Sequence, residues 1–373
     1  MGIKKITCFL WAIVCLLTFA SGLRASDDDS GQSHTRQVES AALRLIYSPI
    51  AYYSPETDLA YGVAGSGIFR LSTKDGRNRP SSISALAIHT QRKQFQLQLE
   101  TDLYLNRLGA RIRAKISYLN YPDKFFGIGA RTQTRDEEVY TSRSLGFCVS
   151  LEKLVWSALS LGVRAQYDTW DVVETLSGGL LDNGAYIGAG GGIVAGIGLI
   201  AIWDSRGRVY SPMSGTLVKA QADFFSRSLG ADYGFSRFIL DARKYLSLFR
   251  GHVVALQSRA ELQSGEVPFN YLARFGGMYA MRGYYDGRFR DHNLVMAQAE
   301  YRMPLFRRVG LVGFVAAGTV APTLGQLDLA NPLLSGGAGV RFVFDKKEHI
   351  VLRMDVGFGK DSSGIYFSIY EAF

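Results

Sequence analysis

The stretch from Met281 to Phe306, MRGYYDGRFRDHNLVMAQAEYRMPLF, contains the pattern that decides the fold. Between Val295 and Met303 apolar and polar residues alternate strictly, with Gln298, Glu300 and Arg302 on one face. Successive side chains of a β-strand point to opposite faces, so this segment is predicted to be a strand with one apolar and one charged face. A soluble β-sandwich also contains strands of this kind, and the rest of the chain has to separate the two architectures.

The same alternation recurs along the chain after residue 58. In residues 93–105, Leu97 shares an apolar face with other aliphatic residues, while Gln96 lies on a face of Gln, Glu and Asp. The polar faces mix Arg, Lys, Glu and Asp on strand after strand, which favours a polar lumen inside a lipid-facing wall over the dry core of a sandwich. We predict about sixteen strands: 59–71, 82–91, 93–105, 108–120, 125–134, 139–153, 156–170, 185–203, 212–225, 232–248, 251–264, 293–303, 308–318, 333–345, 348–359 and 364–373.

These strands predict an all-β fold, a transmembrane antiparallel β-barrel of the bacterial outer membrane, because closing the sheet satisfies every backbone group in lipid. We expect short connections at one end (Gln91–Lys93 and Leu105–Leu108) and longer ones at the other (Leu71–Ser82 and Gly265–His292). Aromatic residues near strand ends are expected to form girdles at the membrane interfaces: Tyr118, Tyr121, Trp156, Trp170, Trp203, Tyr210 and Tyr245.

Residues 1–25 have the pattern of a secretory signal peptide. Lys4 and Lys5 precede an apolar run, and small residues follow it, with Ala25 favoured as the last residue removed. The apolar run covers about 15 residues, fewer than the roughly 20 that a membrane-spanning helix needs. Residues 26–58 are predicted to be a polar, partly disordered lead-in, and residues 59–373 the barrel. Cys148 is then the last remaining cysteine, so no internal disulfide is expected.

The last predicted strand ends on an aromatic residue. Ile365, Phe367, Ile369 and Phe373 are predicted to share one face of it. A phenylalanine after such a strand resembles the signal that the barrel-assembly machinery recognises. We therefore expect Phe373 to serve as an assembly signal and that machinery to be a partner during biogenesis.

Enzyme-like arrangements of residues are not found. The histidines (His34, His89, His252, His292 and His349) are scattered, and none has a metal-ligand spacing to Cys148. The basic residues from Arg288 to Arg308 are interpreted as charge in a lumen or at a rim rather than as a nucleic-acid surface. We expect no catalytic activity, no metal, no cofactor and no nucleic-acid partner.

Three short motifs follow one another in the second half of the chain. Trp203 to Gly215 reads WDSRGRVYSPMSG, and Arg282-Gly283-Tyr284 lies in the long connection before residue 293. Val312 to Gly318 reads VGFVAAG. In this order the motifs resemble those of the bacterial surface antigen superfamily, the outer-membrane barrels of the BamA, TamA and two-partner-secretion translocator type.

The resemblance implies a place for each motif. The Asp, Arg, Pro and Gly of the family's periplasmic turn are matched by Asp204, Arg206, Pro212 and Gly215. The Arg-Gly-Tyr triplet matches the tip of a long loop that folds back into the lumen. In the third motif Ala316 stands where the family has an acidic residue, which there can hold the loop arginine.

A buried arginine without a partner is costly, so we expect another lumen carboxylate to hold Arg282. By alternation Glu300 and Asp355 both face the lumen. Glu300 is the first expected partner of Arg282, and Asp355 the second. Gly283 is expected to allow a tight turn, and Tyr284 to pack across the plane of the guanidinium. These five residues are predicted to form a latch between loop and barrel.

The resemblance also implies a function in inserting or translocating polypeptides. The segment between Ala25 and the first predicted strand is too short for the family's periplasmic polypeptide-transport-associated (POTRA) domains, so we expect a barrel without them. The expected partners are outer-membrane lipid and polypeptide clients or a periplasmic accessory protein. A passive porin-like channel, or a structural barrel with a charged lumen, is the alternative.

Overall fold

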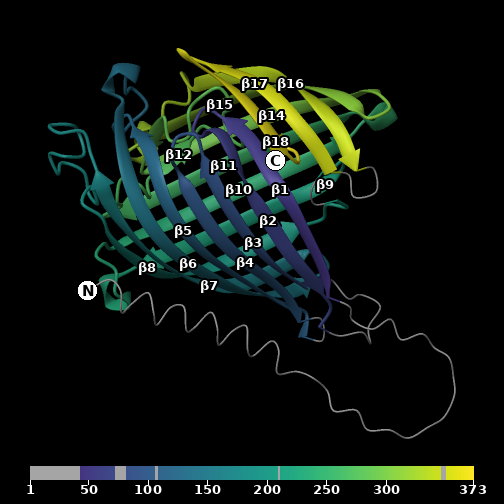
Figure 1. Ribbon diagram of the computed structural model, residues 1–373, viewed down its shortest axis with the longest axis horizontal. Helices are drawn as coiled ribbons and strands as arrows, with labels where there is room; N and C mark the ends of the chain where they lie inside the picture. The colour runs from purple at the N-terminus through teal and green to yellow at the C-terminus, as the bar shows by residue number, and fades with distance from the viewer. Residues whose placement is uncertain (1–42, 72–80, 106–107, 209–210, 346–349) are drawn as a thin grey trace, which may run out of the picture. The chain divides into compact units, whose positions relative to one another are not determined.

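The computed structural model describes residues 43–71, 81–105, 108–208, 211–345 and 350–373. Its strands close into one antiparallel barrel (Figure 1), and β12 Ala273–Phe275 and β13 Phe289–Asp291 form a separate two-stranded sheet. This confirms the predicted all-β barrel of about sixteen strands. The barrel strands are β1 Arg44–Ser54, β2 Asp58–Phe69, β3 Ser81–Thr90, β4 Phe95–Leu105, β5 Ala110–Phe125, β6 Glu138–Trp156, β7 Leu159–Glu174, β8 Gly192–Asp204, β9 Gly215–Phe225, β10 Phe235–Ser247, β11 Val253–Gly265, β14 Asn293–Phe306, β15 Val309–Ala321, β16 Leu333–Asp345, β17 Ile350–Gly359 and β18 Ser362–Ile369.

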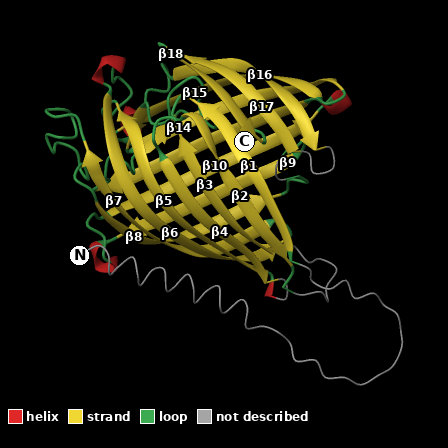
Figure 2. Cartoon of the chain, viewed as in Figure 1, coloured by secondary structure: helices red, strands yellow, loops and turns green. Residues whose placement is uncertain are grey.

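Helices contribute little to the described segments. They are short 3-10 turns in the connections (Figure 2), such as η2 Thr134–Asp136 and η4 Phe249–Gly251. None of these helices is long and apolar enough to cross a membrane. The predicted signal peptide lies outside the described residues.

Two predicted strand assignments were wrong, and their errors cancel in the count. Residues 44–54, predicted to belong to a lead-in, form β1 and pair with β2 from Arg44↔Ile68 to Ser54↔Asp58. Its inward positions mix Ile46 and Ile50 with Arg44 and Ser48, so the polar contrast that identifies the other strands is weak. The predicted strand 125–134 does not exist, because β5 runs on to Phe125 and a connection follows it. The barrel therefore begins at Arg44.

The connections are sorted to the two ends of the barrel. The turns after β3 and after β4 follow consecutive antiparallel strands and lie at opposite ends, so the predicted grouping of Gln91–Lys93 with Leu105–Leu108 was wrong. The longer connections 126–137, 175–191, 226–234, 266–292 and 322–332 do share one end, called here the loop end. The opposite end, called the turn end, has the tight connections 157–158, 248–252 and 307–308.

The two faces of the wall differ in chemistry. Leu97 lies on the outer face and is 49% exposed, while Gln96 faces the lumen and donates to Gln98. Ion pairs cross the inner face, both between the neighbouring strands β9 and β10, as in Arg237–Asp223, and from β7 past β8 to β9, as in Arg164–Asp223. An apolar outside and a charged inside suit a wall that faces lipid.

The predicted aromatic girdles are only partly present. Trp156 and Trp203 are exposed and pack edge to face, with ring centroids 6.5 Å apart. Tyr118 is also exposed, but Trp170 and Tyr245 are buried on the inner face, and Tyr121 lines a cavity inside the barrel. Tyr210 lies outside the described residues.

The last strand is shorter than predicted. β18 ends at Ile369, Tyr370 takes a left-handed conformation with φ 68°, and the following residues turn into the lumen. Phe367 remains exposed on the outer face, whereas Phe373 is 5% exposed and packs against Tyr245 and Ala255. The predicted shared face of Phe367 and Phe373 was therefore wrong.

The assignment of faces can be tested on β4. Replacing Leu97→Arg puts a charge into lipid and is expected to destabilise the barrel by up to about 2–4 kcal/mol, whereas Gln96→Arg in the lumen is expected to cost little. Urea unfolding in lipid vesicles measures both. Equal losses would contradict this strand register.

Candidate functional site

The connection between β11 and β14 fills part of the barrel interior. Within it β12 Ala273–Phe275 pairs with β13 Phe289–Asp291. Phe275, Tyr284 and Phe289 pack with Leu294 and Met296 of β14 in a buried apolar cluster. The connection is rich in aromatic side chains, and packing them against the apolar residues of β14 removes their surface from water. The prediction of a long loop folded into the lumen is confirmed.

Two tyrosines fix the flanks of this loop to carboxylates of the wall. The Tyr271 hydroxyl donates to Asp168 at 2.5 Å, and the Tyr285 hydroxyl donates to Asp123 at 3.0 Å. Burial is the main cause that raises the pKa of each phenol above its ordinary value, so both keep the proton that they donate.

Glycines let the tip of the loop lie directly on β17. Gly283 has φ 115°, a conformation that favours glycine, and a Cβ there would lie 2.5 Å from the carbonyl carbon of Phe358. A Cβ at Gly357 would lie 2.7 Å from the carbonyl carbon of Arg282. Gly359 would meet the Tyr284 ring in the same way, at 2.5 Å. The loop and the strand therefore touch backbone to backbone.

Hydrogen bonds hold the tip in this notch. The Gly283 amide donates to the Tyr366 hydroxyl at 2.9 Å, and the Ser362 hydroxyl donates to the Gly283 carbonyl at 2.7 Å. The Tyr284 hydroxyl donates to the carbonyl of Leu334 at 2.8 Å. The tip is thus bonded to β16 and β18 on either side of β17.

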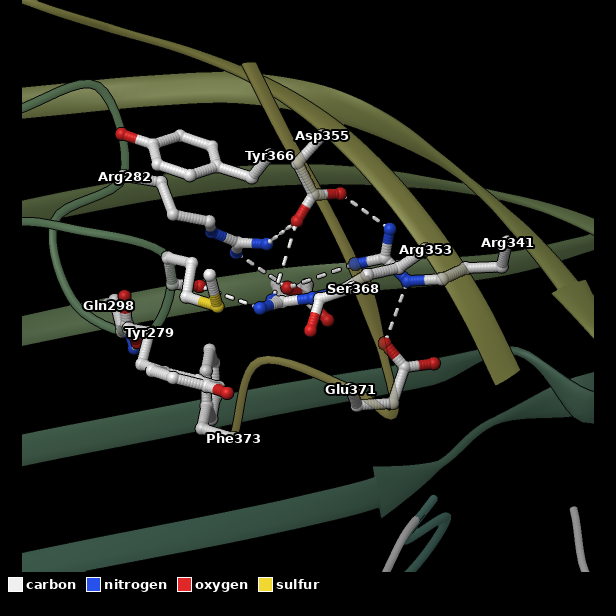
Figure 3. Close-up of polar contacts among 12 residues, drawn as sticks. Tyr279, Arg282, Gln298, Arg341, Arg353, Asp355, Tyr366, Ser368, Glu371 and Phe373 are labelled. Carbon is white, nitrogen blue, oxygen red and sulfur yellow. Dashed lines mark hydrogen bonds and ion pairs between the residues drawn. The ribbon is translucent and has the colours of Figure 1, made fainter. Parts of the chain in front are cut away.

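The guanidinium of Arg282 points toward Asp355 (Figure 3), and it lies between that carboxylate and Glu300. Its Nη2 is 2.6 Å from Glu300 and its Nη1 is 2.5 Å from Asp355, and all three side chains are at most 1% exposed. The structure thus brings together both carboxylates that the sequence offered as alternatives. With little water nearby, each charge depends on the others for its stabilisation.

Further arginines surround the same carboxylates. Arg302 donates to Glu300 at 2.7 Å, and Arg341 donates to Asp355 at 2.5 Å and to Glu371 at 2.7 Å. Together with Arg353, whose Nη1 is 3.5 Å from Asp355, these residues form what we call the ion cluster. Its members are Arg282, Glu300, Arg302, Arg341, Arg353, Asp355 and Glu371.

The aromatic partner of Arg282 differs from the prediction. The guanidinium carbon lies 3.6 Å from the ring centroid of Phe314, in the third motif, while Tyr284 points to the notch instead. Ala316, at the position of the family's acid, is buried in the apolar cluster with Tyr284. A small residue there leaves room for the loop, and Asp355 on β17 is one of the carboxylates that the arginine uses instead.

The first motif, from Trp203 to Gly215, forms the turn between β8 and β9. Arg206 makes two hydrogen bonds to the carboxylate of Asp204, at 3.0 and 2.9 Å. Gly215 has φ 102°, and a Cβ there would lie 2.6 Å from the Ser205 carbonyl oxygen. The Pro212 carbonyl accepts from Arg302 at 3.2 Å, so this turn also reaches the ion cluster.

Phe373 reaches the same cluster from the end of the wall. Its carbonyl oxygen accepts a hydrogen bond of 2.9 Å from Arg302. Predicted as an assembly signal on the outer face, it lies instead inside the barrel. Its role in assembly remains a prediction.

Several members of this site were not predicted from the sequence: Arg341, Arg353, Glu371, Phe314, Gly357 and Tyr366. Alternation places Arg353 and Asp355 on the same inner face of β17, so the sequence could have predicted that they lie close together. Nothing in the sequence pairs Glu371 with Arg341, or Tyr366 with the distant loop tip. Among the residues that the structure describes, no three His, Cys, Asp or Glu side chains gather in a way that could hold a metal ion.

Comparison with known proteins places this geometry in a family. BamA from Haemophilus ducreyi lacking POTRA domains 1–3 has a similar fold, with TM-score 0.60 and 15% identity over 88% of this chain and 70% of that one. CdiB from Acinetobacter baumannii has TM-score 0.55 and 12% identity, and the match spans 88% of this chain and 65% of CdiB. No curated protein matches. The family model described as Omp85 superfamily domain matches residues 76–369, and the chain belongs to that superfamily.

Proposed function

We propose that this barrel inserts or translocates polypeptides at the outer membrane through the seam where β1 meets β18. One observation carries the proposal. β1 and β18 are joined by a single residue pair, Tyr53↔Phe367, whereas β1 pairs with β2 along its whole length. The seam is therefore the weakest junction of the wall.

The seam leaves the backbone of β1 without a neighbour on one side. From Arg44 to Tyr52 no described strand pairs with the edge of β1 that faces away from β2. An unpaired edge costs free energy in lipid, because no water replaces the missing hydrogen bonds. A strand of a client polypeptide supplies that pairing by adding itself to the edge.

The loop tip is placed to control this seam. Gly283 is bonded to Tyr366 and Ser362 of β18, and Arg282 to Asp355 of β17. The two strands next to the seam are thus tied to the loop rather than to β1. Displacing the tip frees β17 and β18 to move, which makes Arg282, Gly283, Tyr284, Glu300 and Asp355 an internal latch.

The orientation follows from the same proposal. The turn with Asp204, Arg206, Pro212 and Gly215 lies at the turn end, which we assign to the periplasm, and the loop end faces outward. Polypeptide clients and a periplasmic accessory protein then approach from the turn end. The barrel acts without catalytic residues or a cofactor.

A passive channel is the second candidate, favoured by the ion pairs along the lumen wall. Against it stand the loop and the inward-turned residues 370–373, which occupy the interior. Conductance of the protein in planar bilayers separates the two. Steady large currents without any client would favour the channel.

A cross-link at the seam tests the proposed route. Tyr53→Cys with Phe367→Cys, once oxidised, is expected to block insertion of a chemically unfolded eight-stranded outer-membrane barrel into vesicles that contain the protein, because the edge of β1 can no longer open. Reduction should restore insertion, which is read as heat-modifiable client on gels. The control pair, Leu97→Cys with Tyr118→Cys across β4 and β5, should leave insertion unchanged. Full insertion with the seam locked would reject the route.

A methyl group in the notch tests the contact between loop and strand. Gly357→Ala is expected to displace the tip, because its Cβ would meet the backbone of Arg282. Protease cleavage within residues 266–292 should rise severalfold. Gly313→Ala is the control, since its Cβ has nothing within 4 Å. Equal cleavage of the two variants would show that the tip does not depend on the notch.

A double-mutant cycle tests the latch pair. Arg282→Ala and Glu300→Ala should each lower the free energy of unfolding, by up to about 3–5 kcal/mol, since each leaves buried charge unmatched. The double variant should be no worse than either single variant, because the two residues act as one unit. Glu100→Ala, at an exposed lumen carboxylate 3.7 Å from Lys115, should cost at most about 1 kcal/mol. Additive losses for Arg282 and Glu300 would show that they are not coupled.

A further inference from the structure

Two turns at the turn end lie side by side and concentrate arginine. The β10–β11 turn contains Arg250, and the β14–β15 turn contains Arg307 and Arg308. The turns are in contact, since a Cβ at Gly251 would lie 3.6 Å from Pro304, and His252 is hydrogen-bonded to Tyr301 at 2.6 Å.

The backbone at these turns is unusual for arginine. Arg250 has φ 52° and Arg307 has φ 44°, a left-handed conformation in which glycine or asparagine is less strained. A turn of this geometry does not need a charged side chain for its own stability. Arg250 and Arg307 therefore point to an interaction outside the turn.

A cavity of about 470 Å³ lies between these turns and the β8–β9 turn. Arg208, Arg250, Arg307 and Arg308 line it together with Arg302 and Arg341 of the ion cluster. Glu371 is the one carboxylate among its described lining residues, and it is already bound by Arg341. Among the described lining residues arginines therefore outnumber carboxylates.

Large apolar side chains flank the arginines. Phe249 is 67% exposed, Phe306 61% and Leu305 53%, and each lies one to three residues from an arginine of the turns. A shift of register between Pro304 and Phe306 interrupts the regular strand there. Exposed aromatic residues beside cations are the arrangement that suits the boundary between acyl chains and phosphate headgroups.

We propose that this cavity, which we call the arginine pocket, binds an anionic phospholipid, with its phosphate on the arginines and its acyl chains along Leu305 and Phe306. Guanidinium groups recognise phosphate oxygens in paired hydrogen bonds, which lysine cannot do. A soluble phosphate would contact the arginines but would not cover the exposed apolar side chains. An acidic polypeptide would use the arginines but does not require the outer wall.

The experiment measures lipid binding by the full chain in a neutral detergent. Phosphatidylglycerol or phosphatidylcholine with the same acyl chains is titrated in, and bound lipid is counted by native mass spectrometry. Phosphatidylglycerol should reach half-occupancy at about one tenth or less of the concentration that phosphatidylcholine needs, since each surface cation adds to the attraction. Equal binding of the two lipids would overturn the proposal.

Matched variants locate the site. Arg250→Gln, Arg307→Gln and Arg308→Gln combined should remove the preference. Arg131→Gln, Arg135→Gln and Lys360→Gln, with the same charge change at the loop end, should keep it. Heat-modifiability shows that each variant is folded, and Arg→Lys at the same three positions should retain only part of the preference. Loss of preference in the loop-end control would show that net charge alone decides binding, against the proposal.

Two competitors distinguish the source of the phosphate. Glycerol phosphate and a polyglutamate peptide are each added at the concentration of the lipid. Neither should displace phosphatidylglycerol, and Phe306→Ala should weaken lipid binding. Displacement by glycerol phosphate would assign the pocket to a soluble phosphate, and displacement by the peptide would assign it to an acidic polypeptide.

Discussion

A guanidinium without water around it has to be matched by carboxylates, and that requirement organises the interior of this barrel. Arg282 lies at the tip of a loop, so its charge can be stabilised only if the loop stays inside and the wall supplies Glu300 and Asp355. Those carboxylates in turn bind Arg302 and Arg341, which reach the β8–β9 turn, Glu371 and the carbonyl of Phe373. One charge is thus linked to segments that are far apart in the sequence.

The tip of the loop that carries Arg282 also explains why the weak seam does not simply open. β18 shares one residue pair with β1, yet it is bonded to the loop tip through Tyr366 and Ser362. Hydrogen bonds from the loop inside the barrel hold β18 in place, where other strands are held by backbone pairing with a neighbour on each side. Contacts of this kind can be exchanged for contacts with another polypeptide without unfolding the rest of the barrel.

Much of this fold was predictable from the sequence, because period-two alternation of charged and apolar residues reports directly which side of a wall faces lipid. The strand predictions are wrong where that contrast is weak. β1 has Ile46 and Ile50 toward the lumen, so it was assigned to a lead-in, and a polar connection after Phe125 was counted as a strand. The inward parity of Glu300 and Asp355 identified the partners of Arg282. The stacking of Phe314, the notch at Gly357 and the inward turn after Ile369 depend on three-dimensional proximity, for which a single sequence contains no signal.

The mixed inner face of β1, where Ile46 and Ile50 alternate with Arg44 and Ser48, has a consequence for how the strand behaves once it is free. In most strands of this barrel, sliding by one residue would turn charged side chains into lipid and is strongly disfavoured. In β1 such a slip turns Ile46, Ser48 and Ile50 outward, and Arg44 at the start of the strand is its one charged residue that changes face. Its partner β2 carries glycine at positions 62, 65 and 67. Register at this edge is therefore weakly specified. A strand that tolerates several alignments can accept partners that differ in sequence, which is what an edge serving unrelated polypeptides requires.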